Sequence, residues 1–88
     1  MDQTQFAKVN FAEQLYNASG SVESNCNGIT FINLGTVPCT VLSYPLLQGQ
    51  SFSPPILSSE LDTTNYTARF DTTIAGSQLL LVIRKYYK

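Results

Sequence analysis

The side chains able to do acid–base chemistry are few in this 88-residue chain. It has no histidine, which removes the most common general base and metal ligand. Carboxylates remain: Glu60 and Asp62 lie two positions apart, and Asp71 follows on a later segment. Paired carboxylates can hydrolyse glycosides, but the pair needs a deep cleft, which a domain of this size rarely forms. We interpret Glu60 and Asp62 as solvated loop charges, and Asp71 as the partner of Arg69 in a surface ion pair.

No cofactor site is predicted either. The five glycines are scattered singly at expected turns and form no phosphate-binding motif. A calcium site at Asp62, with neighbouring hydroxyls and carbonyls, stays open as an alternative. The interpretation is a non-enzymatic protein with no catalytic residue, no metal and no cofactor.

The two cysteines, Cys26 and Cys39, could form a disulfide in a small secreted domain. A two-residue turn at Gly35-Thr36 would pair Ile32 with Cys39. Cys26 then lies six positions from the partner of Cys39, roughly 20 Å away at about 3.3 Å per residue. A disulfide requires Cα atoms within about 7 Å. Unless the chain folds back sharply before Asn27, we expect two separate reduced thiols, Cys39 in the core and Cys26 in a loop.

The first twenty residues show an apolar stripe at helical spacing. The stripe contains Ala7, Phe11, Leu15 and Ala18, and Gly20 could end a helix. The sequence predicts an N-terminal helix or arm over residues 1–20, a polar linker over 21–28 and a β domain over 29–88.

The β domain is predicted from short runs rich in β-branched and aromatic residues, bounded by Gly, Pro and Asn. Pro38 cannot donate to a ladder, so its strand should lie at an edge or be broken there. Gln48-Gly49 is the expected turn of the following connection. The fold class is mainly β: a small antiparallel β-sandwich or partly open barrel of five to six strands, with an N-terminal helical or arm segment. The main predicted strands are 29–34, 37–44, 65–74 and a central strand at 80–83. The predicted core comprises Phe31, Val41, Tyr66, Phe70, Leu80 and Val82.

The surface composition favours association. Charged residues make up 12% of the chain, about half of the usual ~25%, and a surface poor in charge is weakly protected against contact with other chains. Arg84, Lys85 and Lys88 form a small basic end, but we interpret it as the solvated end of a strand, so nucleic acid is not an expected partner. No apolar run approaches the ~20 residues of a membrane span. The N-terminus shows no charged-then-apolar leader, so we expect assembly in a cytoplasm.

The stretch ITFINLGTVPCTVLSYPLLQGQSF, residues 29–52, resembles a pattern common in small β-rich virion structural proteins of bacteriophages. The closing LLLVIRKYYK, residues 79–88, is similar to the terminal strand of such proteins. The resemblance implies a part of a virus particle, such as a capsid decoration, penton, spike or tail component. Its expected partners are other virion proteins and further copies of itself, and its expected location is the virion, assembled in the host cytoplasm. No functional residue is carried over, because the pattern contains none.

Two other function classes stay open. One is a carbohydrate-binding or adhesion module that uses Tyr44, Tyr66, Tyr86 or Tyr87 as a stacking platform. The other is a small nucleic-acid-binding barrel that uses residues 84–88. For the leading hypothesis of an assembly protein, the interface candidates are apolar and aromatic residues near the two ends of the chain: Phe6, Phe11, Leu15, Tyr16, Tyr86 and Tyr87.

Overall fold

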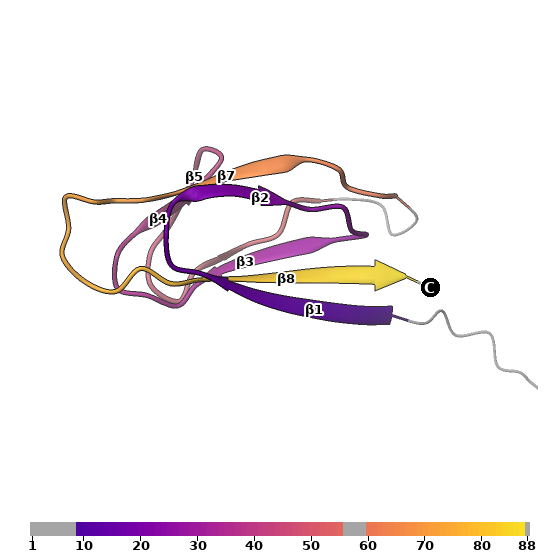
Figure 1. Cartoon of the computed structure of the whole chain (residues 1–88), viewed down its shortest axis with the longest axis horizontal. Helices are drawn as coiled ribbons and strands as arrows, with labels where there is room; N and C mark the ends of the chain where they lie inside the picture. The colour runs from indigo at the N-terminus through magenta and orange to yellow at the C-terminus, as the bar shows by residue number, and fades with distance from the viewer. Residues whose placement is uncertain (1–8, 56–59, 88) are drawn as a thin grey trace, which may run out of the picture.

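The computed structural model describes residues 9–55 and 60–87. Within these residues the chain forms eight strands and no helix, arranged as two antiparallel sheets of four strands each (Figure 1). The prediction of a mainly β fold is confirmed, with more strands than the five to six expected. Phe6 lies outside the described residues.

The two sheets lie in two layers, with β1, β3 and β8 below and β2, β5 and β7 above in Figure 1. Sheet 1 has the order β1 (Val9–Tyr16), β8 (Leu80–Tyr87), β3 (Ile29–Asn33), β6 (Ser51–Phe52). Sheet 2 has the order β2 (Gly20–Glu23), β7 (Asn65–Phe70), β4 (Cys39–Val41), β5 (Tyr44–Leu46).

The predicted N-terminal helix is wrong over the described part of residues 1–20. Residues 9–16 form β1, which pairs with β8 along its whole length, from Val9 opposite Tyr87 to Tyr16 opposite Leu80. Phe11 and Leu15 are four residues apart, a spacing that places side chains on one face in a helix and in a strand alike. A short isolated helix is marginal in water, whereas pairing with β8 satisfies the backbone groups of β1 that face β8.

The segment predicted as a linker, residues 21–28, is packed in the structure. It contains most of β2, and Val22, Ser24 and Cys26 within it are buried. The backbone of Cys26 also exchanges two hydrogen bonds with Asp62, at 2.7 and 3.2 Å between nitrogen and oxygen. Because these contacts come from a distant part of the chain, the polar composition of the segment did not reveal them.

The predicted hairpin at Gly35-Thr36 is wrong, because the chain leaves sheet 1 there and enters sheet 2. The fully buried Asn33 fixes this crossing: its amide nitrogen donates to the carbonyls of Val37 (3.0 Å) and Leu46 (2.8 Å), and its amide oxygen accepts from Gly35 N (3.0 Å). A Cβ at Gly35 would lie 2.3 Å from the carbonyl oxygen of Ser77, so only glycine fits. The Asn-Leu-Gly-Thr sequence therefore encodes a crossing between sheets.

The crossing also corrects the position of the next strand. β4 begins at Cys39, so of the two alternatives at Pro38 the break is the one observed: β4 lies between β7 and β5 inside sheet 2 and not at an edge. The edge position belongs to β5, which carries Pro45 at its centre. The turn at Gln48-Gly49 is confirmed, and Gly49 adopts φ +83°.

The predicted core is confirmed. β8 lies inside sheet 1, and β7 alternates as predicted, with Tyr66, Ala68 and Phe70 buried. Phe31 occupies the centre of the core, with ring centroids 5.1 Å from Tyr66 and 6.3 Å from Phe52. The six predicted core residues, Phe31, Val41, Tyr66, Phe70, Leu80 and Val82, are each exposed by 5% or less.

Phe31→Ala should destabilise the fold strongly, because it removes a fully buried ring and leaves a cavity between the sheets. We expect a loss of about 3–5 kcal/mol in the free energy of unfolding, measured by denaturant titration. Phe11→Ala is the matched control: this ring is 66% exposed, so the monomer should lose little stability. Equal losses in the two variants would contradict the described core.

Candidate functional site

The outward side of sheet 1 carries four of the nine large hydrophobic side chains that are exposed among the described residues: Val9, Phe11, Leu15 and Leu34. Residues directly opposite each other in an antiparallel pair share a face. The register therefore places Leu15, Leu81 and Ile32 in one row, and Glu13, Ile83 and Thr30 in the next. We call this surface the outer face of sheet 1. Its residues in the three long strands are Val9, Phe11, Glu13, Leu15, Thr30, Ile32, Leu81, Ile83, Lys85 and Tyr87.

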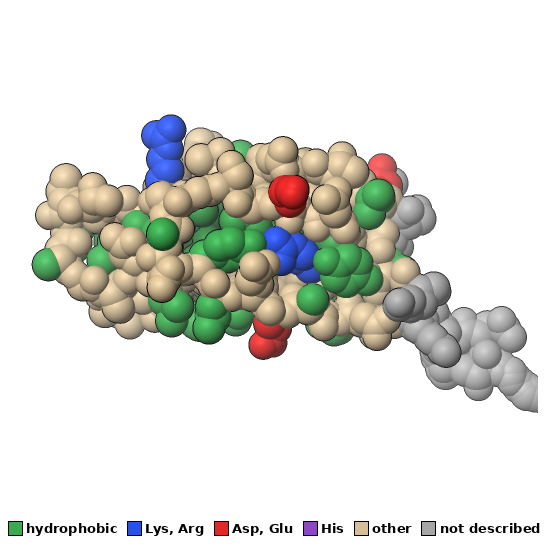
Figure 2. All heavy atoms as spheres, in the orientation of Figure 1, with side chains coloured by type: hydrophobic (Ala, Val, Ile, Leu, Met, Phe, Trp, Pro, Cys, Tyr) green, Lys and Arg blue, Asp and Glu red, His purple; other side chains and the backbone are tan. Residues whose placement is uncertain are grey.

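Several apolar side chains on this face lie open to solvent. Phe11 is 66% and Leu15 is 58% exposed, and Leu34, which directly follows β3, is also exposed. Leu15, Leu34 and Leu81 line one shallow depression, and Phe11 and Ile83 line another with Pro54 and Pro55. Hydrophobic side chains reach the surface along the lower side of Figure 2, where sheet 1 lies.

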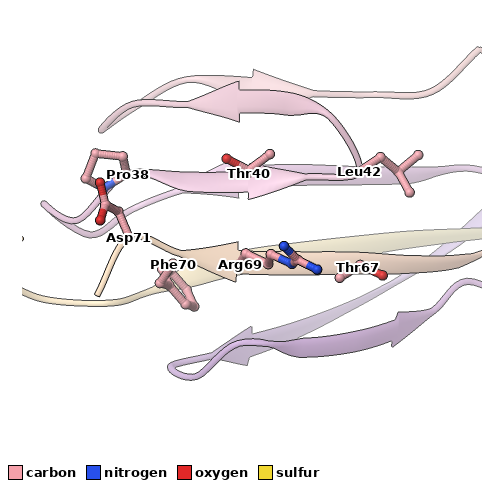
Figure 3. A pocket seen from close by; sticks show the side chains of 7 residues that line it. All are labelled: Pro38, Thr40, Leu42, Thr67, Arg69, Phe70 and Asp71. Atoms are coloured by element: carbon pink, nitrogen blue, oxygen red, sulfur yellow. The ribbon is translucent and has the colours of Figure 1, made fainter. Parts of the chain in front are cut away.

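The outer face of sheet 2 has the opposite character. Thr40 lies opposite Arg69, and Ser21 lies opposite Thr67, so the outward positions of β2, β4 and β7 are polar. Figure 3 shows Thr40, Thr67 and Arg69 side by side in a shallow pocket on this face. Leu42, which is 48% exposed, and Pro38 line the same pocket, so this face is not wholly polar. The outward positions of β2, β4 and β7 are nevertheless polar, whereas those of β1 and β8 are mostly apolar, which makes sheet 1 the candidate interface.

Two charges of opposite sign lie within the apolar face. Glu13 is on β1, and Lys85 is on β8 opposite Phe11. The Lys85 ammonium nitrogen lies 5.3 Å from the ring centroid of Tyr87. A partner of this face therefore needs apolar side chains together with one positively charged group for Glu13 and one negatively charged group for Lys85.

Arg84, which was considered from the sequence as a nucleic-acid contact, forms hydrogen bonds within the protein. Its guanidinium donates to the carbonyl oxygen of Glu23 on β2 from Nε (2.9 Å) and Nη2 (2.7 Å). It also donates to Gln14 Oε1 (2.9 Å) and Tyr16 Oη (3.2 Å) on β1. Arg84 thus joins the edge strand of sheet 1 to that of sheet 2.

The sequence-predicted interface residues fall in different places. Phe11 and Leu15 lie on the outer face of sheet 1. Tyr16 and Tyr86 turn inward and pack against the core, and Tyr87 is half-buried on the outer face. Leu34, Leu81 and Ile83 were missed, because the sequence alone did not show which strands adjoin β1. The apolar run Leu79–Ile83, with both faces apolar, was the signal that β8 has an apolar outward side.

The carboxylate predicted to be a solvated loop charge, Asp62, is instead 8% exposed. It accepts hydrogen bonds from Tyr66 Oη (2.6 Å), Thr64 N (2.8 Å) and Ser24 Oγ (3.1 Å). The bond from Thr64 N closes a local turn, in which an aspartate side chain accepts from the backbone N–H two residues later. The Asp62-Thr63-Thr64 sequence could have indicated this turn. Asp62 therefore fastens its loop to β2 and β7. Asp71 accepts from Thr73 N, without the predicted contact to Arg69 among the described residues.

The environment of Asp62 shifts two pKa values. Burial raises the pKa of the Asp62 carboxyl, but hydrogen bonds from Tyr66, Thr64 and Ser24 outweigh burial and hold that pKa below its ordinary 3.8. Burial, the bond to Asp62 and the negative charge there raise the pKa of Tyr66 to about 12. The pair is thus a carboxylate and a neutral phenol at neutral pH, which suits structural bonding.

Both cysteines are free, so the prediction of separate thiols is confirmed. The register used to reach it was wrong, since Cys39 pairs with Phe70 and Leu46 rather than with Ile32. Cys26 lies between β2 and β3, outside the strands as predicted, but it is fully buried, and its thiol donates to the carbonyl of Gly28 at 3.1 Å. Burial raises the pKa of the Cys39 thiol, which makes it a poor nucleophile.

The tyrosines considered as a stacking platform are also dispersed. Tyr66 is buried and bonded to Asp62, and Tyr86 packs on the core. Tyr44 is 53% exposed, and its ring stacks on Phe52 with centroids 4.3 Å apart.

The comparisons add no relative to this geometry: no family model, no curated protein and no solved structure matches the chain. No helix able to cross a membrane occurs in the described part of the chain. Across residues 9–55 and 60–87, no group of three or more Cys, Asp or Glu side chains could hold a metal ion. A function therefore has to be argued from the chain's own surfaces.

Asp62→Asn should remove a pH-dependent part of the stability. Because the folded pKa of Asp62 lies below its unfolded value of 3.8, its contribution is present above that pH and is lost as pH falls through the folded pKa. We expect the variant to lose about 1–3 kcal/mol at pH 7, with a difference from wild type that shrinks in acid. Melting temperatures measured from pH 2 to pH 7 test this.

Glu23→Gln, at an exposed carboxylate of β2, is the control for the substitution itself and should melt close to wild type at pH 7. A constant difference between Asp62→Asn and wild type across the whole pH range would contradict the account of Asp62.

Proposed function

We propose that the chain is a non-enzymatic structural protein of a bacteriophage virion. It packs through the outer face of sheet 1 against copies of itself or against other virion proteins. The observation that carries the packing is the contrast between the outward positions of β1 and β8, which are mostly apolar, and those of β2, β4 and β7, which are polar. The assignment to a phage particle, as a capsid decoration, penton, spike or tail component, depends on the resemblance of residues 29–52 and 79–88.

The size of the apolar face supports a large contact. Burying one large apolar side chain contributes about 1.5–3 kcal/mol, and association costs roughly 4–15 kcal/mol in lost freedom. Phe11 and Leu15 together contribute at most about 6 kcal/mol, which offsets only the low end of that cost. The proposed contact therefore also includes Leu34, Leu81 and Ile83, and it covers β1 and β8 at the same time.

The architecture proposed for this role is a β-sandwich rather than a barrel. In the described residues no strand is paired with both sheets, so the two sheets meet through side chains. A sandwich leaves each outer face as an open, nearly flat surface, which suits packing between repeated subunits.

A carbohydrate-binding function is the second candidate, and it rests on Tyr44 stacked on Phe52. A single exposed ring gives little stacking area, so we place it after assembly. Binding on a glycan array that disappears in Tyr44→Ala would reverse this order.

The proposed function predicts that the chain is a constituent of particles. Mass spectrometry of virions purified from the producing culture should find it in a fixed ratio to the other virion proteins. In particles made with the Leu15→Lys variant the chain should be depleted, because a charge is then buried on the apolar face. Leu47→Lys is the matched control, since Leu47 is 56% exposed and follows β5 of sheet 2.

A chain found only outside purified particles would overturn the proposed function. Equal incorporation of the Leu15→Lys and Leu47→Lys chains would overturn the role of the outer face of sheet 1.

A further inference from the structure

We propose that β1 joins two copies of this chain edge to edge, as an antiparallel pair across a two-fold axis that makes one continuous eight-stranded sheet. This inference rests on the proposed function and names the first partner, a second copy, and the element that binds it. It is carried by the free edge of β1, by the self-complementary order of its side chains and by the placement of Glu13 and Lys85.

The four sheet edges of the described residues differ in their capacity to pair. Unpaired edges recruit other strands unless they are short or carry proline, lysine or similar protection. β6 has two residues; β5 has three, with Pro45 at its centre; β2 has four, from Gly20 to Glu23. β1 has eight residues without proline, glycine or a basic side chain. Three edges are protected and one is not.

The outer edge of β1 carries backbone groups that no described strand pairs with. In an antiparallel ladder, alternate residues direct their N–H and C=O groups toward the same neighbour. Among residues 9–55 and 60–87, β1 pairs with β8 alone, so every second residue of β1 directs these groups away from the sheet. Every residue of β1 except Tyr16 is exposed. A second strand would satisfy this row of donors and acceptors.

A second copy of β1 fits this edge in one register. Residues directly opposite each other share a face. If the outer faces of both copies lie on the same side, the two-fold axis must therefore pass between one residue of β1 and the same residue of the other copy. With Glu13 on the axis, two carboxylates would face each other, which is unfavourable. With Phe11 on the axis, only residues 9–13 of the described strand overlap. With Ala12 on the axis, residues 9–15 overlap.

The Ala12 register also places complementary side chains together. Val9 then lies opposite Leu15 of the other copy, and Phe11 lies opposite Glu13. Within each copy, Lys85 of β8 lies on the other side of Phe11, as its partner in the sheet. Glu13 of one copy and Lys85 of the other are therefore two strands apart, about 9.5 Å between Cα atoms, a distance that the two long side chains span. The opposite charges meet over the Phe11 ring, and the same contact forms twice by symmetry.

The pairing would also join the two apolar outer faces into one surface. β1 lies at the border of the lower layer in Figure 1, so a second copy placed beside it continues that layer. The joined surface has twice the apolar area of one chain, and it would be the surface that meets the next virion component.

The experiment is a cysteine cross-link at the axis, made in the full chain with Ala12→Cys. A residue opposite itself in an antiparallel pair has Cα atoms about 4.5–5.5 Å apart, within disulfide range. Mild oxidation should shift the band on a non-reducing gel to twice the chain mass. The native Cys26 and Cys39 are buried and should not contribute. Melting temperature verifies that the variant is folded.

Two variants serve as controls. Phe11→Cys should cross-link weakly, because the two copies of residue 11 lie about 8 Å apart in this register. Ala18→Cys places an exposed thiol in the loop between β1 and β2 and reports random collision. A doubled mass in Ala12→Cys, well above both controls, supports the pairing.

Other outcomes overturn it. Stronger cross-linking at residue 11 than at residue 12 excludes the Ala12 register. Association of the wild-type chain in sedimentation, with Ala12→Cys no more cross-linked than Ala18→Cys, shows a contact elsewhere. A chain that stays monomeric at every concentration excludes pairing with a second copy. None of these results decides whether the chain occurs in virions, so failure of the pairing and failure of the proposed function are distinguishable.

Discussion

The pairing of β8 with both β1 and β3 determines the architecture of sheet 1. Each residue from Leu80 to Tyr87 has a partner on β1, and residues 80–84 have a second partner on β3. A strand held on both sides cannot slip by one residue without turning its core side chains to solvent. The run from Leu80 to Ile83 therefore serves two surfaces, with Leu80 and Val82 in the core and Leu81 and Ile83 on the outer face.

Buried and partly buried polar groups connect the two layers that the thin apolar core separates. Asn33 bonds backbone groups on both sides of the crossing between sheets, and Arg84 joins β1 to the carbonyl of Glu23 on β2. Asp62 accepts from Tyr66 and so holds residues 60–64 on sheet 2. Each of these groups has its hydrogen-bonding partners, as burial requires. Asn33, Asp62 and Arg84 are thus engaged in hydrogen bonds that hold the fold, and the proposed contact surface is the apolar face with the edge of β1.

Local sequence patterns predicted the strands in which apolar residues follow a single clear period. The alternation at Tyr66, Ala68 and Phe70 and the apolar centre of β8 were correct for that reason. The N-terminal segment failed because Phe11 and Leu15 fit two periods equally, and only the partner strand β8, about seventy residues away, decides between them. The crossing at Asn33 resembled a hairpin because the Gly-Thr turn is local, while the bonds that redirect the chain come from Ser77 and Leu79. Phe11 and Leu15 of the candidate site could be predicted from the sequence. Leu34 could not, because its place beside Leu15 depends on the order of β1, β8 and β3 in sheet 1.

We infer that β1 is an open edge in the single chain and a paired strand in the assembled one. Hydrogen exchange of the full chain, followed residue by residue at low and high concentration, tests this pairing most directly. We expect the amides of β1 that point away from β8 to exchange rapidly in the dilute chain and to become protected on concentration. The amides of β8 should be protected in both states. Rapid exchange of the outward amides of β1 at every concentration, in samples that have associated, would show that β1 is not the paired strand.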